Sequence, residues 1–426
     1  MATAGDRLDL VVFGATGFTG QFVVEEIARI ETENAGLSWG IAGRSRAKLE
    51  KIRQQAAKET GRSLEHVEIL VADVSDQDSL DRMASRSKVV INCVGPYRFY
   101  GEQVVKACVN NGASTVDISG EPQFLEGMQL KYHEAAEKAG VYVVGACGFD
   151  SIPADMGTCF VHEKFDGDLN GIESYFKVQT GPKGYRGIHY ATYQSAIHGF
   201  ANAHELGPLR KQLFGKRLPR SNHKLPNRGN LHYSDVISAY CLPFLGSDKS
   251  VVQRSVFHNY ETRGWRNIQY SPYVGIGGML RTVGVTILLA FFGLMASFKF
   301  GRTLLEKYPR AMTLGAVSHD GPTREQMAET SFSMTFVASG WKQKAPRDEQ
   351  HSEKPDQSLV ARVSGPECGY IATPICLVQS AITILKEADK MPGTGGVYSP
   401  GAAFLDSTLI QRLTEHDVKF EVLGDK

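Results

Sequence analysis

The residues best able to do chemistry lie in a glycine-rich turn near the start of the chain. Seven consecutive residues form this turn: Gly14, Ala15, Thr16, Gly17, Phe18, Thr19 and Gly20. The turn follows an apolar run at residues 8–13 and precedes an amphipathic stretch at about 19–30, which predicts a strand, a tight turn and a helix. Such glycines let the backbone approach a pyrophosphate, and the helix N-terminus favours an anion. The spacing is GxxGxxG rather than GxGxxG, so a purely structural turn is the alternative to dinucleotide binding.

The residues after the second predicted strand bear on which dinucleotide is bound. An acidic residue there would bind the ribose hydroxyls of NAD, whereas Arg44 and Ser45 suit the 2′-phosphate of NADP. We therefore expect NADP as the cofactor, with NADPH preferred over NADH, and a solvated turn is the alternative. Asp73 follows the third predicted strand, where it would accept a hydrogen bond from the adenine amino group or cap a helix starting near Ser75.

Polar side chains also follow the fourth, fifth and sixth predicted strands. Ligands of a doubly wound sheet bind beyond the carboxyl ends of its strands, so these side chains are expected to converge. The residues expected beside the nicotinamide ribose are Asn92, Val94, Gly95, Pro96 and Tyr97. Hydride transfer also needs a proton donor or acceptor near the substrate. The candidates of suitable type are Tyr97, Tyr100, Asp117, Glu121 and Asp150, and for each of them a capping or turn role is the alternative.

The sequence does not support several other chemistries. None of the 16 tyrosines has a lysine four residues later, so the Tyr-x-x-x-Lys pair used by short-chain dehydrogenases is missing. The seven cysteines are scattered without a CxxC pair, so we expect no metal site, no disulfide framework and an intracellular protein. The formal net charge of +1 gives no electrostatic argument for a nucleic-acid partner.

An alternation of apolar runs and amphipathic stretches over residues 7–147 positions these candidates. The predicted strands are 8–13, 39–42, 67–71, 89–93, 115–118 and 141–144. This alternation predicts an α/β fold with an N-terminal Rossmann domain built on a doubly wound parallel sheet. We assign residues 1–154 to this domain and 155–366 to a second α/β domain that binds the substrate. The remaining segment, 367–426, is expected to return to the first domain through a helix at about 371–386.

One stretch of the second domain, residues 282–298, contains no charged side chain. As a helix its 17 residues would span about 26 Å, slightly less than the roughly 30 Å hydrocarbon core of a bilayer. The flanking cations are Arg281, Lys299, Arg302, Lys307 and Arg310. We interpret the stretch as a monotopic or hairpin insertion into a membrane or lipid monolayer, with Tyr270 and Tyr273 at the interface. A buried core helix and a transmembrane span are the alternatives. Residues 1–6 are too few and too polar for a signal peptide.

Motifs spread over the whole chain resemble one family, the saccharopine dehydrogenase-like oxidoreductases of animals. The matching stretches are VVFGATGFTG at 11–20, AGRS at 42–45, NCVGPYRFYG at 92–101, DISGE at 117–121, GFDSIP at 148–153, GYIATP at 369–374 and GGVYSPG at 395–401. The resemblance implies a Rossmann domain with an α/β substrate domain. It also implies association with the cytosolic face of lipid droplets or membranes, and it leaves a homodimer open. Bacterial trans-acting enoyl reductases are more distant relatives, which makes a lipid-like enoyl, carbonyl or imine substrate plausible.

Three functions follow from these expectations. The first is an NADP(H)-dependent oxidoreductase that acts on a lipid or other small-molecule substrate, in lipid or glycolipid metabolism. The second is a nucleotide-binding scaffold or sensor on lipid surfaces with little turnover. The third is a saccharopine or related amino-acid dehydrogenase, although residues 181–195 offer only Lys183 and Arg186 for a substrate with several carboxylates.

Overall fold

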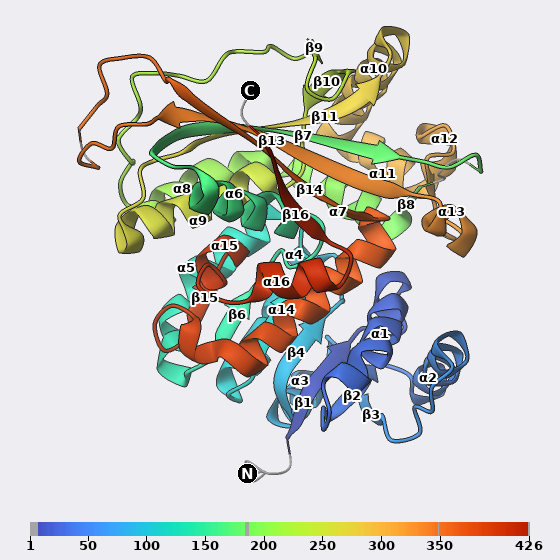
Figure 1. The fold of residues 1–426 in the computed structure, drawn as a ribbon. Coiled ribbons are helices and arrows are strands. Elements are labelled where there is room, and N and C mark those ends of the chain that lie inside the picture. The colour runs from blue at the N-terminus through green and yellow to red at the C-terminus, as the bar shows by residue number, and fades with distance from the viewer. Residues whose placement is uncertain (1–6, 184–186, 348, 425–426) are drawn as a thin grey trace.

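The computed structural model describes residues 7–183, 187–347 and 349–424, so residues 1–6 and Arg186 lie outside the described residues. Seven parallel strands form the first sheet, in the order β15-β6-β5-β4-β1-β2-β3 (Figure 1). Their bounds are β1 Leu8–Phe13, β2 Trp39–Gly43, β3 Glu68–Val71, β4 Ser87–Asn92, β5 Ser114–Asp117, β6 Tyr142–Val144 and β15 Gly396–Tyr398. All six strands predicted between residues 8 and 144 are confirmed, and β15 was not predicted.

Helices cover both faces of this sheet, which confirms the doubly wound α/β fold. One face carries α1 (Phe18–Ile30) and α2 (Arg46–Thr60), and the other carries α3 (Gln77–Ser85), α4 (Tyr97–Asn110) and α5 (Pro122–Ala139). Because both faces are covered, the central strands are continuous apolar runs, and every residue of β2 is buried. The sheet therefore holds the strand ends in a rigid row.

A second, mixed sheet follows in the order β16-β14-β13-β7-β11-β10-β9. Its strands are β7 Asp168–Gln179, β9 His232–Ser234, β10 Ala239–Pro243, β11 Gln269–Gly277, β13 Ser331–Trp341, β14 Gln357–Pro366 and β16 Lys419–Gly424. Neighbours pair antiparallel except for β7 and β11. Helices α6 (Ile152–Lys164) and α9 (Asp248–Arg263) pack between the two sheets (Figure 1). A Cβ at Gly157 would lie 2.3 Å from the Phe336 ring, so this glycine lets α6 approach the second sheet closely.

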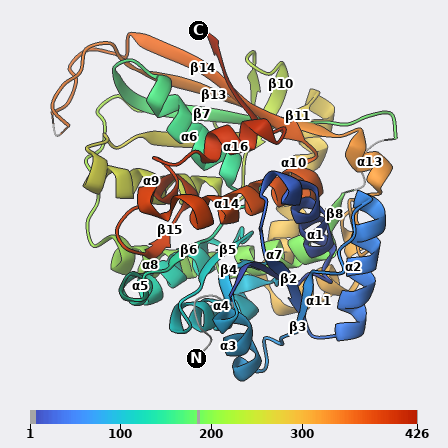
Figure 2. The ribbon, with the colours of Figure 1, turned by 60° about the horizontal axis from the view of Figure 1, so that its bottom comes forward.

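The C-terminal segment joins both sheets. A π-helical turn, Cys368–Ala372, leads into α14 (Thr373–Glu387), which packs beside α1 and over β4 (Figure 2). This confirms the predicted helix that returns to the first sheet. The segment then adds β15 to the first sheet, passes through α15 (Pro400–Ala403) and α16 (Leu409–Glu415), and adds β16 to the second sheet. The predicted third segment is therefore shared between the two sheets.

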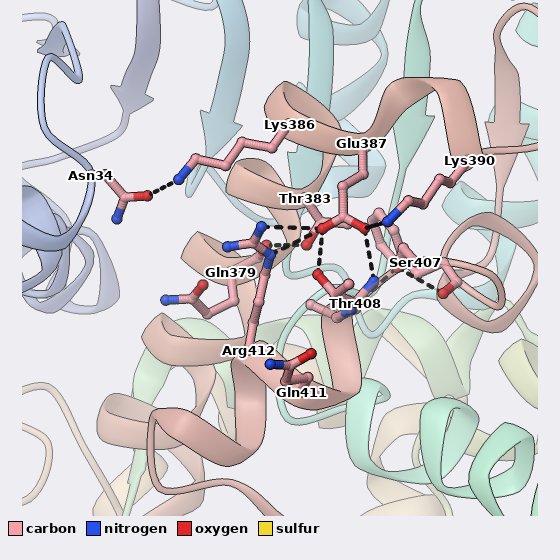
Figure 3. Close-up of polar contacts among 12 residues, drawn as sticks. Asn34, Gln379, Thr383, Lys386, Glu387, Lys390, Ser407, Thr408, Gln411 and Arg412 are labelled. Carbon is pink, nitrogen blue, oxygen red and sulfur yellow. Dashed lines mark hydrogen bonds and ion pairs between the residues drawn. The ribbon is translucent and has the colours of Figure 1, made fainter.

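A carboxylate at the end of α14 holds this returning segment together (Figure 3). Glu387 accepts hydrogen bonds from the Thr408 hydroxyl and from the Thr408 amide at 2.9 Å. It also pairs with Lys390 at 3.0 Å and with Arg412 at 3.1 Å. Burial alone would raise the pKa of Glu387, but these hydrogen bonds outweigh it and bring the pKa to about 2.

A further group of helices lies at one end of the second sheet (Figure 1). They are α7 (Tyr190–Ala201), α10 (Met279–Ser297), α11 (Lys299–Lys307), α12 (Pro309–Met312) and α13 (Arg324–Ala328), whereas α8 (Leu206–Phe214) packs on α5. Two short strands, β8 (Ile188–His189) and β12 (Val317–Ser318), pair parallel beside them. Helix α10 contains most of the uncharged stretch at residues 282–298.

Candidate functional site

The glycine turn has the geometry of a phosphate-binding turn. Gly14 adopts a φ of +84°, and a Cβ there would lie 2.7 Å from Cγ2 of Val94. A Cβ at Gly20 would lie 2.2 Å from the Gly14 carbonyl oxygen, so only glycine allows α1 to begin this close to the turn. No side chain caps the N-terminus of α1 at Gly17. Its first amides are therefore left for an external anion, and the turn fits a pyrophosphate.

The surroundings of Arg44 fit the adenosine end of NADP. Arg44 is exposed just beyond β2, and no described residue hydrogen-bonds or pairs with its guanidinium. Ser45 caps α2 by accepting from the Lys48 amide at 3.4 Å. The guanidinium is therefore free to meet a 2′-phosphate, while the Ser45 hydroxyl is partly engaged.

Asp73 forms a local turn beyond β3. Its carboxylate accepts from the amide of Ser75 at 2.9 Å and from the hydroxyl of Ser75 at 2.8 Å. These bonds, together with the nearby charge of Arg44, lower the pKa of Asp73. The next helix, α3, begins at Gln77 and is capped by Asp76. The predicted capping role of Asp73 is therefore wrong, because the helix starts two residues later than expected.

The end of β4 lies directly against the glycine turn. Val94 contacts Gly14 as described above, and the Val94 amide donates to the side-chain oxygen of Asn92 at 3.0 Å. Gly95 is exposed, and the buried Pro96 precedes the first turn of α4. Val94 thus lies against the dinucleotide turn, and the binding of the dinucleotide by Asn92, Val94, Gly95 and Pro96 stays a prediction.

Tyr97 is buried, and its hydroxyl is engaged with the backbone. The hydroxyl donates to the Asn92 carbonyl at 2.8 Å and accepts from the Ile118 amide at 3.4 Å. Burial, with the charge of Asp117, raises the pKa of Tyr97 well above its usual value. Both hydrogen-bonding functions of this hydroxyl are occupied, so we assign Tyr97 to the positioning of β4 and β5 rather than to proton transfer.

Glu121 is also buried and serves as a cap. Its carboxylate accepts from the amides of Tyr97 and Arg98, both at 3.0 Å, and from the Ser195 hydroxyl at 2.9 Å. A carboxylate at the first amides of α4 satisfies the unpaired donors there and interacts favourably with the helix dipole. This explains why α4 begins at Tyr97, and it leaves Glu121 committed to the fold.

Asp117 and Asp150 are the two carboxylates of this row that remain available for proton transfer. Asp117 is buried at the end of β5, where Oδ1 accepts from the Ser119 amide at 2.9 Å and from the Ala146 amide at 3.2 Å. Burial raises the pKa of Asp117 to about 7 despite these bonds. Asp150 is half-buried beyond β6, and Cβ atoms built at Gly120 and Gly246 would lie 3.1 Å and 2.9 Å from its Oδ2.

The partners of Asp150 come from a distant segment that sequence reasoning missed. Oδ1 of Asp150 accepts from the Ser247 hydroxyl at 2.7 Å, from the Ser247 amide at 3.1 Å and from the Ser151 hydroxyl at 3.0 Å. The next residue, Asp248, is buried, and burial together with the charge of Asp150 raises its pKa well above the usual value. Ser247 and Asp248 follow no strand of the first sheet, and the sequence contains no spacing signal that links them to Asp150.

Tyr100 differs from the other candidates because it faces outward. It is 39% exposed on the first turn of α4, and its ring lies 6.1 Å from that of Phe99. The hollows beside His133 and beside Trp341 share no residue with the ends of β4, β5 and β6. We use the term strand-end site for residues at or beyond the carboxyl ends of β1, β2, β4, β5 and β6: Gly14, Arg44, Asn92, Val94, Asp117 and Asp150.

The parallel sheet, the uncapped glycine turn and the free Arg44 together define a dinucleotide-binding oxidoreductase. A family model described as saccharopine dehydrogenase NADP binding domain matches residues 10–144. Saccharopine dehydrogenase-like oxidoreductase from Homo sapiens is 45% identical over 100% of this chain and 99% of its own length. A Caenorhabditis elegans relative named lipid droplet localized protein is 40% identical over 98% of both chains. The chain belongs to the saccharopine dehydrogenase-like oxidoreductases, and its cofactor is NADP.

A solved structure supports the same fold. Apo saccharopine dehydrogenase (L-Glu forming) from Saccharomyces cerevisiae has a TM-score of 0.54 and 13% identity, covering 98% of this chain and 100% of that one. At this identity the similarity concerns the fold alone.

Lys183, one of the two cations considered for a carboxylate-rich substrate, is exposed and pairs with Glu325 at 2.7 Å.

Proposed function

We propose that this protein is an NADP-dependent reductase that works at a lipid surface on a lipid-linked enoyl, carbonyl or imine substrate. The observation that carries the proposal is an exposed apolar helix, packed on the second sheet, in a chain whose first sheet carries the dinucleotide turn. Only 11% of the most apolar window of α10 is buried. Its exposed side chains include Leu280 at 90%, Ile287 at 66% and Leu294 at 64%. An apolar surface of this extent marks an interaction site.

The structure contradicts two expectations about the uncharged stretch and its surroundings. The alternative of a buried core helix is wrong, because neighbouring elements cover only one side of α10. Tyr270 and Tyr273 were expected at a lipid interface, but both are buried in β11. Tyr270 hydrogen-bonds Ser174 at 2.8 Å, and Tyr273 stacks on Tyr175 with ring centres 5.4 Å apart. The sheet requires these aromatic rings as part of its own packing.

The connections of α10 favour a helix that lies in the lipid surface over one that crosses it. The chain enters α10 from β11 in the second sheet and leaves it into α11, which packs against α10 and α7. Both ends are therefore tied to the same folded body, whereas a crossing helix would have to separate them. Lys299, Lys307 and Arg310 are exposed after α10, and Arg281 is exposed near its start. These cations suit anionic lipid headgroups.

The strand-end site supplies the groups that a reductase needs. NADPH, when bound at the glycine turn and Arg44, supplies a hydride to the substrate. We assign the accompanying proton to Asp150, because it is half-buried beyond β6 and its Oδ2 has one hydrogen bond, a long one of 3.4 Å from the Ser247 amide, among the described residues. Asp117 is the second candidate, since a carboxyl with a pKa of about 7 can exchange a proton near neutral pH.

Calorimetric titration with NADPH and with NADH tests the cofactor half of the proposal. Arg44→Asp is expected to weaken NADPH binding by at least about tenfold, because a charge-assisted contact to phosphate contributes roughly 1.5–3 kcal/mol. Lys51→Asp is the matched control, since Lys51 is exposed on α2 away from the turn. Equal losses in both variants, or unchanged affinity in Arg44→Asp, would contradict the assignment.

Incubation with NADPH and a lipid extract tests the reaction. The wild-type protein is expected to oxidise NADPH only when the extract is present, and Asp150→Asn is expected to keep NADPH binding while losing turnover. If bound NADPH is never oxidised, the protein is a nucleotide-binding scaffold. Saccharopine-dependent formation of NADPH would instead support the amino-acid dehydrogenase.

A further inference from the structure

One face of helix α7 contacts residues that follow β4 and β5, next to the strand-end site. The Ser195 hydroxyl donates to Glu121 at 2.9 Å, and the Gln123 side chain donates to the Gly199 carbonyl at 3.3 Å. The ring of His198 lies 5.1 Å from that of Phe99, on the first turn of α4. This face of α7 therefore lies where the chain leaves β4 and β5.

The opposite side of α7 contacts the lipid-facing helices. The rings of Tyr193 and Phe200 each lie 5.5 Å from that of Phe292 in α10. His198 lies 3.2 Å from Glu306 of α11, and the buried Ile197 joins an apolar cluster with α10 and α11. A single helix of 12 residues, about three turns, thus separates the proposed lipid surface from the strand-end site.

Aromatic side chains lie on both sides of this boundary: Phe200 contacts Phe292 on the α10 side, and Phe99 contacts Tyr100 and His198 on the α4 side. We use the term aromatic seam for Phe292, Phe200, Phe99 and Tyr100. Phe200 is 41% exposed, Phe99 is 45% exposed and Tyr100 is 39% exposed, although large aromatic rings contribute most when they are buried. The seam begins on α10 and ends on the first turn of α4, directly after the strand-end residues at the end of β4.

We propose that the aromatic seam binds the acyl chain of a membrane-resident lipid, so that the substrate's reducible group reaches the strand-end site while its tail stays in the lipid layer. This inference rests on the proposed docking of α10. It assigns an apolar recognition role to Tyr100 rather than proton transfer. It also gives a role to the aromatic rings of Phe200 on α7 and of Phe99 and Tyr100 on α4, which are left partly exposed.

Tryptophan fluorescence quenching by brominated phosphatidylcholine vesicles tests the proposal. The three native tryptophans, Trp39, Trp265 and Trp341, are all at most 7% exposed and belong to neither α10 nor the seam. The probe variants are Phe99→Trp in the seam, Leu294→Trp on α10 and Leu130→Trp on α5, where Leu130 is 40% exposed. We expect quenching of the first two and none of the third.

A second substitution shows whether the chain reaches Phe99 along the seam. Adding Phe200→Asp to Phe99→Trp is expected to abolish the quenching, because it places a charge between α10 and α4. The same substitution in Leu294→Trp is expected to leave quenching intact, which shows that docking and folding survive. Adding Leu130→Asp to Phe99→Trp is the matched control and is expected to change nothing.

The outcomes separate the two proposals. Quenching of Leu294→Trp without quenching of Phe99→Trp overturns the seam while lipid docking stands. Quenching of Phe99→Trp that persists with Phe200→Asp also overturns it, since α4 would then touch lipid by another route. Absence of quenching in Leu294→Trp refutes the docking on which the seam depends, and the seam fails with it.

Discussion

Two helices of this chain, α10 and the run Cys368–Lys390 that contains α14, are long and apolar enough to cross a membrane, and the fold treats them in opposite ways. Their most apolar windows are 11% and 78% buried, respectively. The second run packs beside α1, β4 and α16, whereas the neighbours of α10 cover one side only. Length and hydropathy alone therefore do not distinguish a helix that packs in the protein core from one that stays exposed.

The polar residues of α14 show what core burial requires. Ser380 and Thr383 are buried and donate to the carbonyls one turn back, Cys376 at 2.7 Å and Gln379 at 2.8 Å. Glu387 at the end of the helix is fully paired, as described above. These three polar side chains of α14 are satisfied inside the protein, which removes the cost of leaving them unpaired, whereas Nε2 of the buried Gln379 has no hydrogen-bond partner among the described residues. Helix α10 leaves its apolar side chains in solvent, and we propose that lipid covers them.

The largest expected effect contrasts one leucine from each helix. Leu377 is completely buried in α14, so Leu377→Ala is expected to lower the free energy of unfolding by about 3 kcal/mol through lost burial and a cavity. Leu294 is 64% exposed, so Leu294→Ala is expected to change the free energy of unfolding by less than about 0.5 kcal/mol. Urea unfolding followed by circular dichroism measures both. Similar losses in the two variants would mean that α10 is packed in solution.

The second prediction concerns the pH dependence of the packed end of α14. The pKa of Glu387 is about 2 in the folded protein and 4.5 in its ordinary state, so its stabilisation is complete above pH 4.5 and is lost as the pH falls toward 2. Its cations are partly exposed, so we expect a contribution on the order of 2–3 kcal/mol. Glu387→Gln should lower the free energy of unfolding by this amount at pH 7. If the difference in unfolding free energy between variant and wild type stays the same as the pH falls toward 2, the prediction is contradicted.

The third prediction concerns the lipid-facing side of α10. Ile287→Ser is expected to reduce binding to lipid vesicles by about tenfold, because it removes one apolar side chain from the proposed interface. The free energy of unfolding should stay unchanged, since Ile287 is 66% exposed. Vesicle co-flotation measures binding, with Val422→Ser on β16 as the control, because Val422 is 45% exposed on the second sheet. Unchanged flotation of Ile287→Ser would argue against docking through α10.

The smallest expected effect concerns the cations beside α10. Lys299→Gln and Arg310→Gln are each expected to weaken binding to phosphatidylserine-containing vesicles by about 1 kcal/mol. The difference should shrink in high salt, where surface charges are screened. Lys419→Gln, an exposed change on β16, is the control. If the loss is the same on pure phosphatidylcholine, the cations do not act through lipid charge.

The strands of the first sheet were predictable because each is a compact apolar run. The predicted strand at residues 8–13 coincides with β1, Leu8–Phe13. β15, Gly396–Tyr398, was missed because three residues after a glycine-rich turn carry no periodicity, and only pairing with β6 makes them a strand. The start of helix α4 at Tyr97 depends on Glu121, which caps it from another part of the chain.

The residues of the candidate site also differ in whether their roles depend on local sequence or on distant contacts. The glycine turn and Arg44 were predictable because their roles depend on local backbone and charge. The tasks of Tyr97 and Glu121 were not, because a tyrosine or glutamate that caps or braces the fold has the same sequence signature as one that transfers a proton. Ser247 was missed because its contact with Asp150 crosses about a hundred residues of chain.

The placement of β15 has a consequence for synthesis. β6 ends at Val144, but the strand that covers its outer edge begins at Gly396, about 250 residues later. At roughly 5–20 residues per second, a ribosome needs about 10–50 s to make that interval. Throughout this time the nascent chain exposes an unpaired strand edge, which is a template for aggregation. We therefore expect the emerging protein to depend on a chaperone that shields β6 until its last strand is made.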